Sequence, residues 1–174
     1  MSEDPLDAVY SYVERAYIRL QAGDLLIRCL DEGSTTAIQQ MVEGLVLAGP
    51  QSLIVLKEIL AEAGQRKSQL QDDLSQIFNE MEKSLNGYGV HLTPGRTPRS
   101  MARSSASSFL KLLREQGIED EGKQMECLQI MRNGKELLKG LIGSIRLLED
   151  IEHYLLDWLW GLAYQSTRND PKVS

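Results

Sequence analysis

The residues closest to a metal-binding arrangement are Glu149, His153 and Asp157, which are spaced four apart and therefore share one face of a helix. Carboxylate-bridged dinuclear sites in helical bundles need two Glu-x-x-His pairs and two further carboxylates. Only the segment from Asp150 to His153 approximates one pair, with aspartate in place of glutamate, and there is no second copy. We therefore predict a charged, solvated face, with no metal site and no cofactor.

Other catalytic patterns are weaker still. The sequence has no Gly-x-Ser-x-Gly elbow, and Cys127 has no histidine at an informative spacing. Gly-Lys pairs at Gly122 and Gly134 lack the spacing of a phosphate-binding loop and a preceding strand. We predict no catalytic residues and a protein that is not an enzyme.

One segment differs in charge from the rest of the chain, which has a formal net charge of −6. Positions 93–114 hold no acidic residue and five basic ones, namely Arg96, Arg99, Arg103, Lys111 and Arg114. The net charge argues against nucleic-acid binding by the whole body, because phosphate contacts need excess positive charge, but it allows a local contact. We predict that these five residues bind a partner.

Several interpretations of the basic segment remain open. It could be a solvated connector, fold back on acidic helices of its own or a sister chain, or dock an acidic protein or nucleic acid. Phe109 is the only nearby aromatic residue, so base stacking has little support. Thr93 and Thr97 each precede a proline near an arginine, and phosphorylation there would cancel much of the local positive charge.

Aromatic residues gather near the C-terminus of the sequence: Tyr154, Trp158, Trp160 and Tyr164. Trp158 and Trp160 are two positions apart and cannot share one helix face. The end of this helix is therefore apolar on more than one side. Either neighbouring helices of a bundle cover these residues, or they form a subunit or partner interface, where tryptophan and tyrosine are enriched.

The elements that must position these residues are helices. A first helix is predicted from Asp4 and Pro5 to a stop at Gly33. Its apolar stripe consists of Leu6, Val9, Tyr10, Val13, Tyr17, Leu20, Ile27 and Leu30. Further helices are predicted over 34–48, 50–85, 104–115 and 120–166. Because apolar and polar residues never alternate past about four positions, we predict no strand.

The two long helices, 50–85 and 120–166, determine the predicted architecture. At 1.5 Å per residue the first is about 50 Å long, so it must pack along another long helix. We predict an all-α, elongated bundle in which the two pack antiparallel, in coiled-coil fashion, with the short helices against them. One chain of this size covers such long apolar stripes poorly, so we expect a homodimer. Gly134, Gly140 and Gly143 predict close helix approach or a kink.

We divide the chain into N-terminal helices over 1–92, a basic flexible loop over 93–103, C-terminal helices over 104–166 on the same core, and a frayed tail over 167–174. Cys29 and Cys127 lie in apolar runs, which predicts buried free thiols and a reducing, cytoplasmic location. The acidic first residues do not resemble a signal peptide, and no apolar run of about 18 residues exists, so no membrane contact is expected.

These observations favour a non-enzymatic interaction protein, an adaptor or regulator that contacts other proteins through its helical surface and basic loop. The alternative is a nucleic-acid-binding transcriptional regulator that uses positions 96–114, duplicated in a dimer. A helix-turn-helix around positions 48–50 is disfavoured, because its second helix begins with apolar residues and carries only Lys57 near its start.

Overall fold

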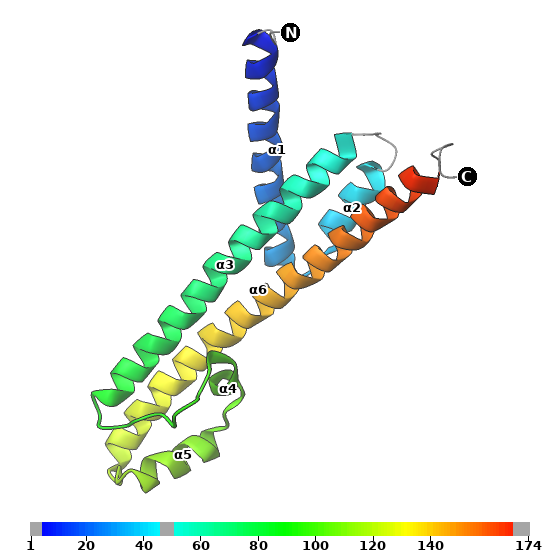
Figure 1. Cartoon of the computed structure of the whole chain (residues 1–174). Coiled ribbons are helices and arrows are strands. Elements are labelled where there is room, and N and C mark those ends of the chain that lie inside the picture. Colours follow the sequence, from blue (N-terminus) through cyan, green and yellow to red (C-terminus); the bar gives the residue numbers. More distant parts are fainter. Residues whose placement is uncertain (1–4, 46–50, 169–174) are drawn as a thin grey trace. The chain divides into compact units, whose positions relative to one another are not determined.

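The computed structural model describes residues 5–45 and 51–168, without the side chains at positions 7, 11, 45, 51, 52 and 162–168. The described residues form helices and no strand (Figure 1). The helices are α1 (Pro5–Glu32), α2 (Thr36–Leu45), α3 (Gln51–Asn86), α4 (Pro98–Arg103), α5 (Ala106–Glu115) and α6 (Glu121–Arg168). The predicted all-α bundle with two long helices is therefore confirmed. Asp4 and the turn at 48–50 lie outside the described residues, as does the predicted tail after position 168.

The chain forms two compact units, and both long helices contribute to each of them. Unit 1 comprises residues 1–67 and 146–174, so it holds α1, α2, the first part of α3 and the last part of α6. Unit 2 comprises residues 68–145, with the rest of α3 and α6 and with α4 and α5 between them. Each unit contains one cysteine, Cys29 or Cys127, and both are buried and free, as predicted.

The core of unit 1 combines one face from each of its four helices. Its buried apolar residues are Ala22, Leu26, Cys29, Ile38, Val42, Leu56, Ile59, Ala63, Leu148, Ile151 and Leu155. Lys67 is a polar entry in the apolar stripe of α3, and the structure gives its reason: its ammonium group lies 2.8 Å from a carboxylate oxygen of Glu152 on α6. Gly33 ends α1 with a φ of +66°, a conformation that glycine adopts at helix ends without steric cost.

The core of unit 2 is closed by the chain that connects α3 to α6. Its buried apolar residues include Leu74, Met81, Leu85, Val90, Met101, Phe109, Leu113, Met131, Leu138 and Ile145. The side chain of Gln116, at the end of α5, accepts a hydrogen bond from the His91 backbone N–H at 2.7 Å and donates one to the His91 carbonyl at 2.5 Å. This pair of bonds joins the segment after α3 to the end of α5.

Residues 93–103 differ from the flexible loop that we predicted, because they contain α4. The Thr97 hydroxyl accepts from the Ser100 N–H at 3.1 Å, and the Ser100 hydroxyl accepts from the Thr97 N–H at 2.9 Å, which is a capping box. Pro98 does not break this helix, because proline is favoured in a first helical turn. Met101 and Ala102 of α4 are buried in the core of unit 2.

The three glycines of α6 behave differently from one another. A Cβ at Gly134 would overlap the Met81 side chain of α3, which confirms close helix approach there. Gly140 and Gly143 have no such neighbour within 4 Å among the described residues, so close approach does not explain them. The α-helix continues through all three positions.

Candidate interaction surfaces

The first half of α1, positions 5–20, carries a row of large apolar side chains at the surface. Val9, Tyr10, Tyr12, Val13, Tyr17 and Leu20 are between 57% and 75% exposed. No described side chain in this half is buried, whereas Ala22, Leu26 and Cys29 of the second half are. Only the second half of α1 is thus anchored in the core of unit 1.

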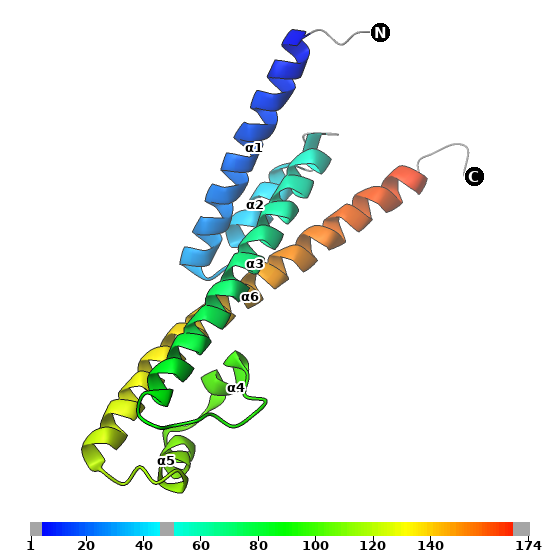
Figure 2. The ribbon, with the colours of Figure 1, turned by 60° about the vertical axis from the view of Figure 1, so that its left-hand side comes forward.

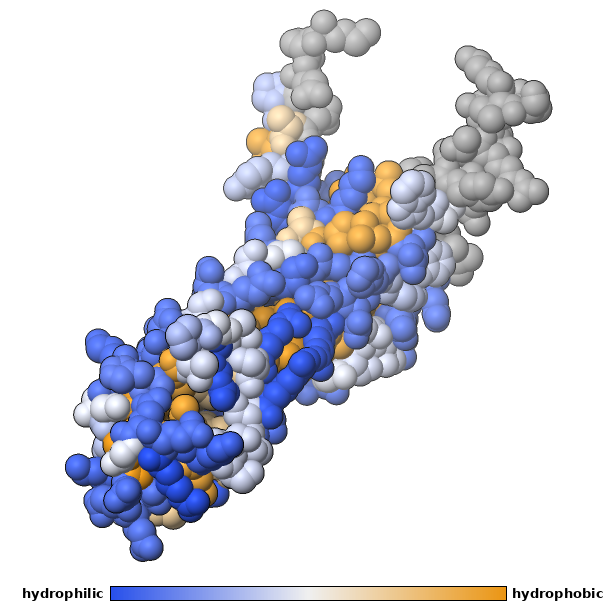
Figure 3. Space-filling view, turned by 60° about the horizontal axis from the view of Figure 1, so that its bottom comes forward, coloured by the Kyte–Doolittle hydropathy of each residue, from blue (hydrophilic) through white to orange (hydrophobic). Residues whose placement is uncertain are grey.

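The figures agree with this difference between the two halves of α1. In Figures 1 and 2 the first turns of α1 extend past the end of α2 and the start of α3, its neighbours in unit 1. Figure 3 shows hydrophobic side chains at the surface of the turns that follow the grey N-terminal residues. Apolar surface of this extent is uncommon on a monomeric protein and is typical of an interaction site.

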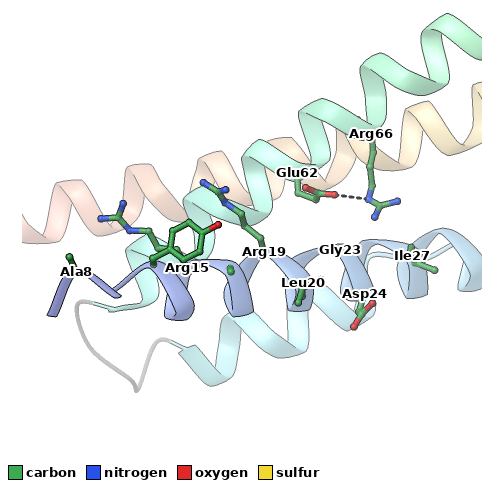
Figure 4. A pocket seen from close by; sticks show the side chains of 11 residues that line it. Ala8, Arg15, Arg19, Leu20, Gly23, Asp24, Ile27, Glu62 and Arg66 are labelled. Carbon is green, nitrogen blue, oxygen red and sulfur yellow. Dashed lines mark ion pairs between the residues drawn. The ribbon is translucent and has the colours of Figure 1, made fainter. Parts of the chain in front are cut away.

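A groove of about 1090 Å³ runs along α1 beside α3, within unit 1 (Figure 4). Its apolar lining comes from Ala8, Tyr12, Ala16, Leu20 and Ile27 of α1. Gly23 is buried at this groove, and its lack of a side chain leaves room for α3 to approach α1. A Cβ at Gly23 would lie 3.2 Å from a terminal guanidinium nitrogen of Arg66.

Charged groups line the two sides of this groove. Arg19 points from α1 toward α3, whereas Leu20 and Asp24 point away from α3 (Figure 4). Arg19 pairs with Glu58 at 3.1 Å, and Arg66 pairs with Glu62 at 3.3 Å. The Arg19 side chain is 65% exposed in spite of its ion pair, so it can bind a second acceptor.

Three of the four predicted C-terminal aromatic residues have described side chains, and their surroundings differ. Tyr154 and Trp158 are half-buried and meet edge to face, with ring centroids 6.4 Å apart. Trp160 is 76% exposed. The side chain of Tyr164 lies outside the described residues. The Tyr154–Trp158 pair therefore stabilises the end of α6 in unit 1, and Trp160 is the aromatic residue that is available at the surface.

The predicted basic segment is divided in the structure, because Arg96 does not join the other four cations. Pro94 and Gly95, with a φ of +86°, form a tight turn in which the Arg96 N–H donates to the Thr93 carbonyl at 3.1 Å. The Arg96 side chain is half-buried and donates to the Ser104 hydroxyl. Arg99 and Arg103 of α4, like Lys111 and Arg114 of α5, are exposed and form no ion pair with another described residue.

Ser104 is the polar centre of this region of unit 2. Besides the contact with Arg96, its backbone carbonyl accepts from the Lys135 ammonium at 2.5 Å. Two cations thus meet at the C-terminal end of α4, where the helix leaves unpaired carbonyl groups and partial negative charge. Arg96 and Lys135 stabilise the fold here, and sequence spacing could not show it because the contact joins positions 31 apart.

Three described side chains have a raised pKa: Cys29, Cys127 and Tyr88. Burial raises the pKa of both Cys29 and Cys127, which keeps their thiols protonated and unreactive. The Glu126 carboxylate accepts a hydrogen bond from the Tyr88 hydroxyl and raises the pKa of that phenol. Within the described ranges, no three His, Cys, Asp or Glu side chains lie close enough to hold a metal ion.

The surface of α1 is the feature that sequence reasoning missed. Its three-four spacing predicts an apolar stripe, but periodicity does not show what covers that stripe. A signal was present: Leu6, Val13, Leu20 and Ile27 recur at intervals of seven, a period typical of helices that pair with another helix.

None of the helices in the described part of the chain is long and apolar enough to cross a membrane. Comparison of the chain with protein-family models finds no match. Comparisons with curated proteins and with solved structures find no match either.

Proposed function

We propose that this protein is a non-enzymatic interaction protein, an adaptor or regulator that acts by binding another polypeptide along the first half of α1. The observation that carries this proposal is the row of exposed apolar side chains from Val9 to Leu20. Covering a large apolar side chain contributes about 1.5–3 kcal/mol, so several such residues supply enough free energy for stable association.

Two further features support a polypeptide as the ligand. The apolar row repeats at helical spacing, as expected for a surface that receives another helix in a groove. The groove beside it continues the same surface and carries arginine and aspartate at its sides, which gives a partner polar contacts as well as apolar ones. Trp160 in the same unit is an additional exposed anchor.

The proposal is tested by affinity capture from the native source, with and without nuclease, using the tagged chain and the variant Val13→Asp/Leu20→Asp. We expect the wild-type chain to recover specific polypeptides, its own untagged copy included, and the variant to lose them. Glu14→Lys/Gln21→Lys is the matched control, because it changes neighbouring exposed positions outside the apolar row. Equal recovery by all three proteins would contradict the proposal.

A second candidate function, nucleic-acid binding, is favoured by one observation: Arg99, Arg103, Lys111 and Arg114 are exposed without ion-pair partners among the described residues. Four cations are enough for a salt-dependent contact with phosphates and too few for sequence reading. The test is retention on heparin and a mobility shift with duplex DNA, each against Arg99→Gln/Arg103→Gln. A shift that this variant retains, or no shift at low salt, would exclude the candidate.

A further inference from the structure

We infer that the chain bound along the first half of α1 is the same half of a second copy, with the two α1 helices parallel and in register. This inference rests on the proposed function, because it names the partner of the same surface. Three observations support this inference: the heptad spacing of α1, the match between its flanking residues and those of an identical helix, and the charges at the sides of the groove.

The heptad repeat of α1 defines a seam that can pair with itself. The a positions are Leu6, Val13, Leu20 and Ile27, and the d positions are Val9, Ala16, Gly23 and Leu30. Val13 and Leu20, in the middle of the seam, are 57% and 69% exposed. The small residue at the d position between them, Ala16, allows two helix backbones to approach closely.

The flanking positions favour the parallel arrangement. In a parallel pair, each g residue faces the e residue that lies five positions further along the other helix. This rule places Tyr12 opposite Tyr17 and Arg19 opposite Asp24 of the second copy. Both pairs are complementary, one aromatic and one of opposite charge, and the two-fold symmetry of the dimer forms each of them twice.

The structure already positions the charged partners for this contact. Arg19 lies on the side of the groove toward α3, with Arg66 of α3 as a further lining cation. Asp24 points to the opposite side, away from α3. The second copy's Asp24 therefore lies on the side of the groove that holds Arg19, which is exposed beside its partner Glu58 and can bind a second carboxylate. The seam ends there, because Arg66 and Glu62 already lie over Gly23.

A second copy fits this surface better than an unrelated helix for one reason. The apolar row and its flanking charges are complementary to themselves in the parallel register, so one helix supplies both halves of the match. An unrelated partner would need its own acidic residue opposite Arg19 and its own aromatic residue opposite Tyr12. That partner is the competing outcome of the experiments below.

The first experiment is disulfide cross-linking of the full chain under mild oxidation. In the parallel register, residues at one a position face each other, so Val13→Cys and Leu20→Cys each form a symmetric cross-link. The control Glu14→Cys, at the neighbouring exposed position, should cross-link at least about tenfold more slowly because it points away from the seam. Cys29 and Cys127 are buried, and peptide mapping identifies which sulfur atoms are joined.

A mixture of the two cysteine variants tests the direction of the helices. If position 13 joins position 20 in preference to symmetric links, the helices are antiparallel and the inference is wrong. If neither variant cross-links faster than the Glu14→Cys control, the second copy does not occupy this surface, and the inference is also wrong.

The second experiment is sedimentation of the purified chain over a range of concentrations. We expect a dimer that Val13→Asp/Leu20→Asp weakens by about tenfold or more and that Glu14→Lys/Gln21→Lys leaves unchanged. Asp24→Arg should weaken it as well, and Arg19→Asp/Asp24→Arg should restore it by exchanging the charges. A chain that is monomeric throughout, while its α1-dependent capture of a different polypeptide persists, overturns this inference and leaves the proposed function standing.

Discussion

Two segments of this molecule, the helix α5 and the first half of α1, each have an apolar face, and only the face of α5 is covered. The apolar face of α5, with Phe109 and Leu113, is buried in the core of unit 2. The apolar face of α1 between Val9 and Leu20 is exposed. The sequence of a helix thus determines its apolar face, while the rest of the chain determines whether that face is covered.

The two units differ in the same way. Of the large apolar residues that are exposed in the described structure, only Met125 and Leu137 belong to unit 2. The others belong to unit 1: Leu6, Val9, Tyr10, Tyr12, Val13, Tyr17, Leu20, Ile27, Leu53, Ile54, Leu156 and Trp160. Unit 2 covers its own core, and unit 1 leaves apolar surface that a partner can cover.

The largest expected difference in the free energy of unfolding is between substitutions at two leucines, Leu113 of α5 and Leu20 of α1. Leu113→Ala removes a fully buried side chain from unit 2 and should lower the free energy of unfolding by about 2–5 kcal/mol. Leu20→Ala removes an exposed one and should change it by about 0.5 kcal/mol or less when the chain is dilute enough to be monomeric. Urea unfolding followed by circular dichroism measures both values. Similar losses would show that the first half of α1 is buried in the monomer.

Substitutions at two glycines of α6 test whether close helix approach explains Gly134 in unit 2. Gly134→Ala should lower the free energy of unfolding by about 1–3 kcal/mol, because the new Cβ would overlap Met81. Gly140→Ala is the matched control on the same helix; it has open space and should stabilise the protein by about 0.5–1 kcal/mol through helix propensity. If the two variants shift the urea midpoint in the same direction, close approach does not explain Gly134.

Substitutions near Ser104, the polar centre of unit 2, should change the free energy of unfolding less. Lys135→Met removes the donor to the Ser104 carbonyl and should lower the free energy of unfolding by about 1–2 kcal/mol. Arg103→Met, on the neighbouring helix, removes an exposed cation without an ion-pair partner in the described structure and should change it by about 0.5 kcal/mol or less. Calorimetry at one pH compares them, and a larger loss for Arg103→Met would refute this assignment of roles.

The smallest effect is expected at Tyr88. Its pKa in the folded chain is raised above the ordinary 10.0 by the hydrogen bond to Glu126, so this bond contributes stability below pH 10 that is lost as the pH rises through the folded value. Glu126→Gln should lower the pKa of Tyr88. Ultraviolet titration of the variant, with Tyr88→Phe to assign the signal, measures the change. An unaltered titration curve would show that Glu126 does not hold the Tyr88 proton.

The positions of the long helices could be predicted from the sequence, but the contacts that their side chains make could not. Both long helices were predicted to within two residues, because periodicity and the glycine stops are local signals. The helix α4 was missed because Pro98 was weighed without the capping box between Thr97 and Ser100. The Arg96 side chain is half-buried because it donates to Ser104, and this contact depends on the fold. The positive charge of Arg96 alone predicted that it binds a partner at the surface.

Hydrogen exchange measured at low and high protein concentration reports whether a second polypeptide covers the first half of α1. If a second polypeptide copy covers the first half of α1, backbone amides between Val9 and Leu20 should become protected as the concentration rises. Those of α5 should keep the same protection at every concentration, because unit 2 covers them itself. Val13→Asp/Leu20→Asp should abolish the dependence in α1. Exchange in α1 that is independent of concentration, or that changes together with α5, would contradict the account.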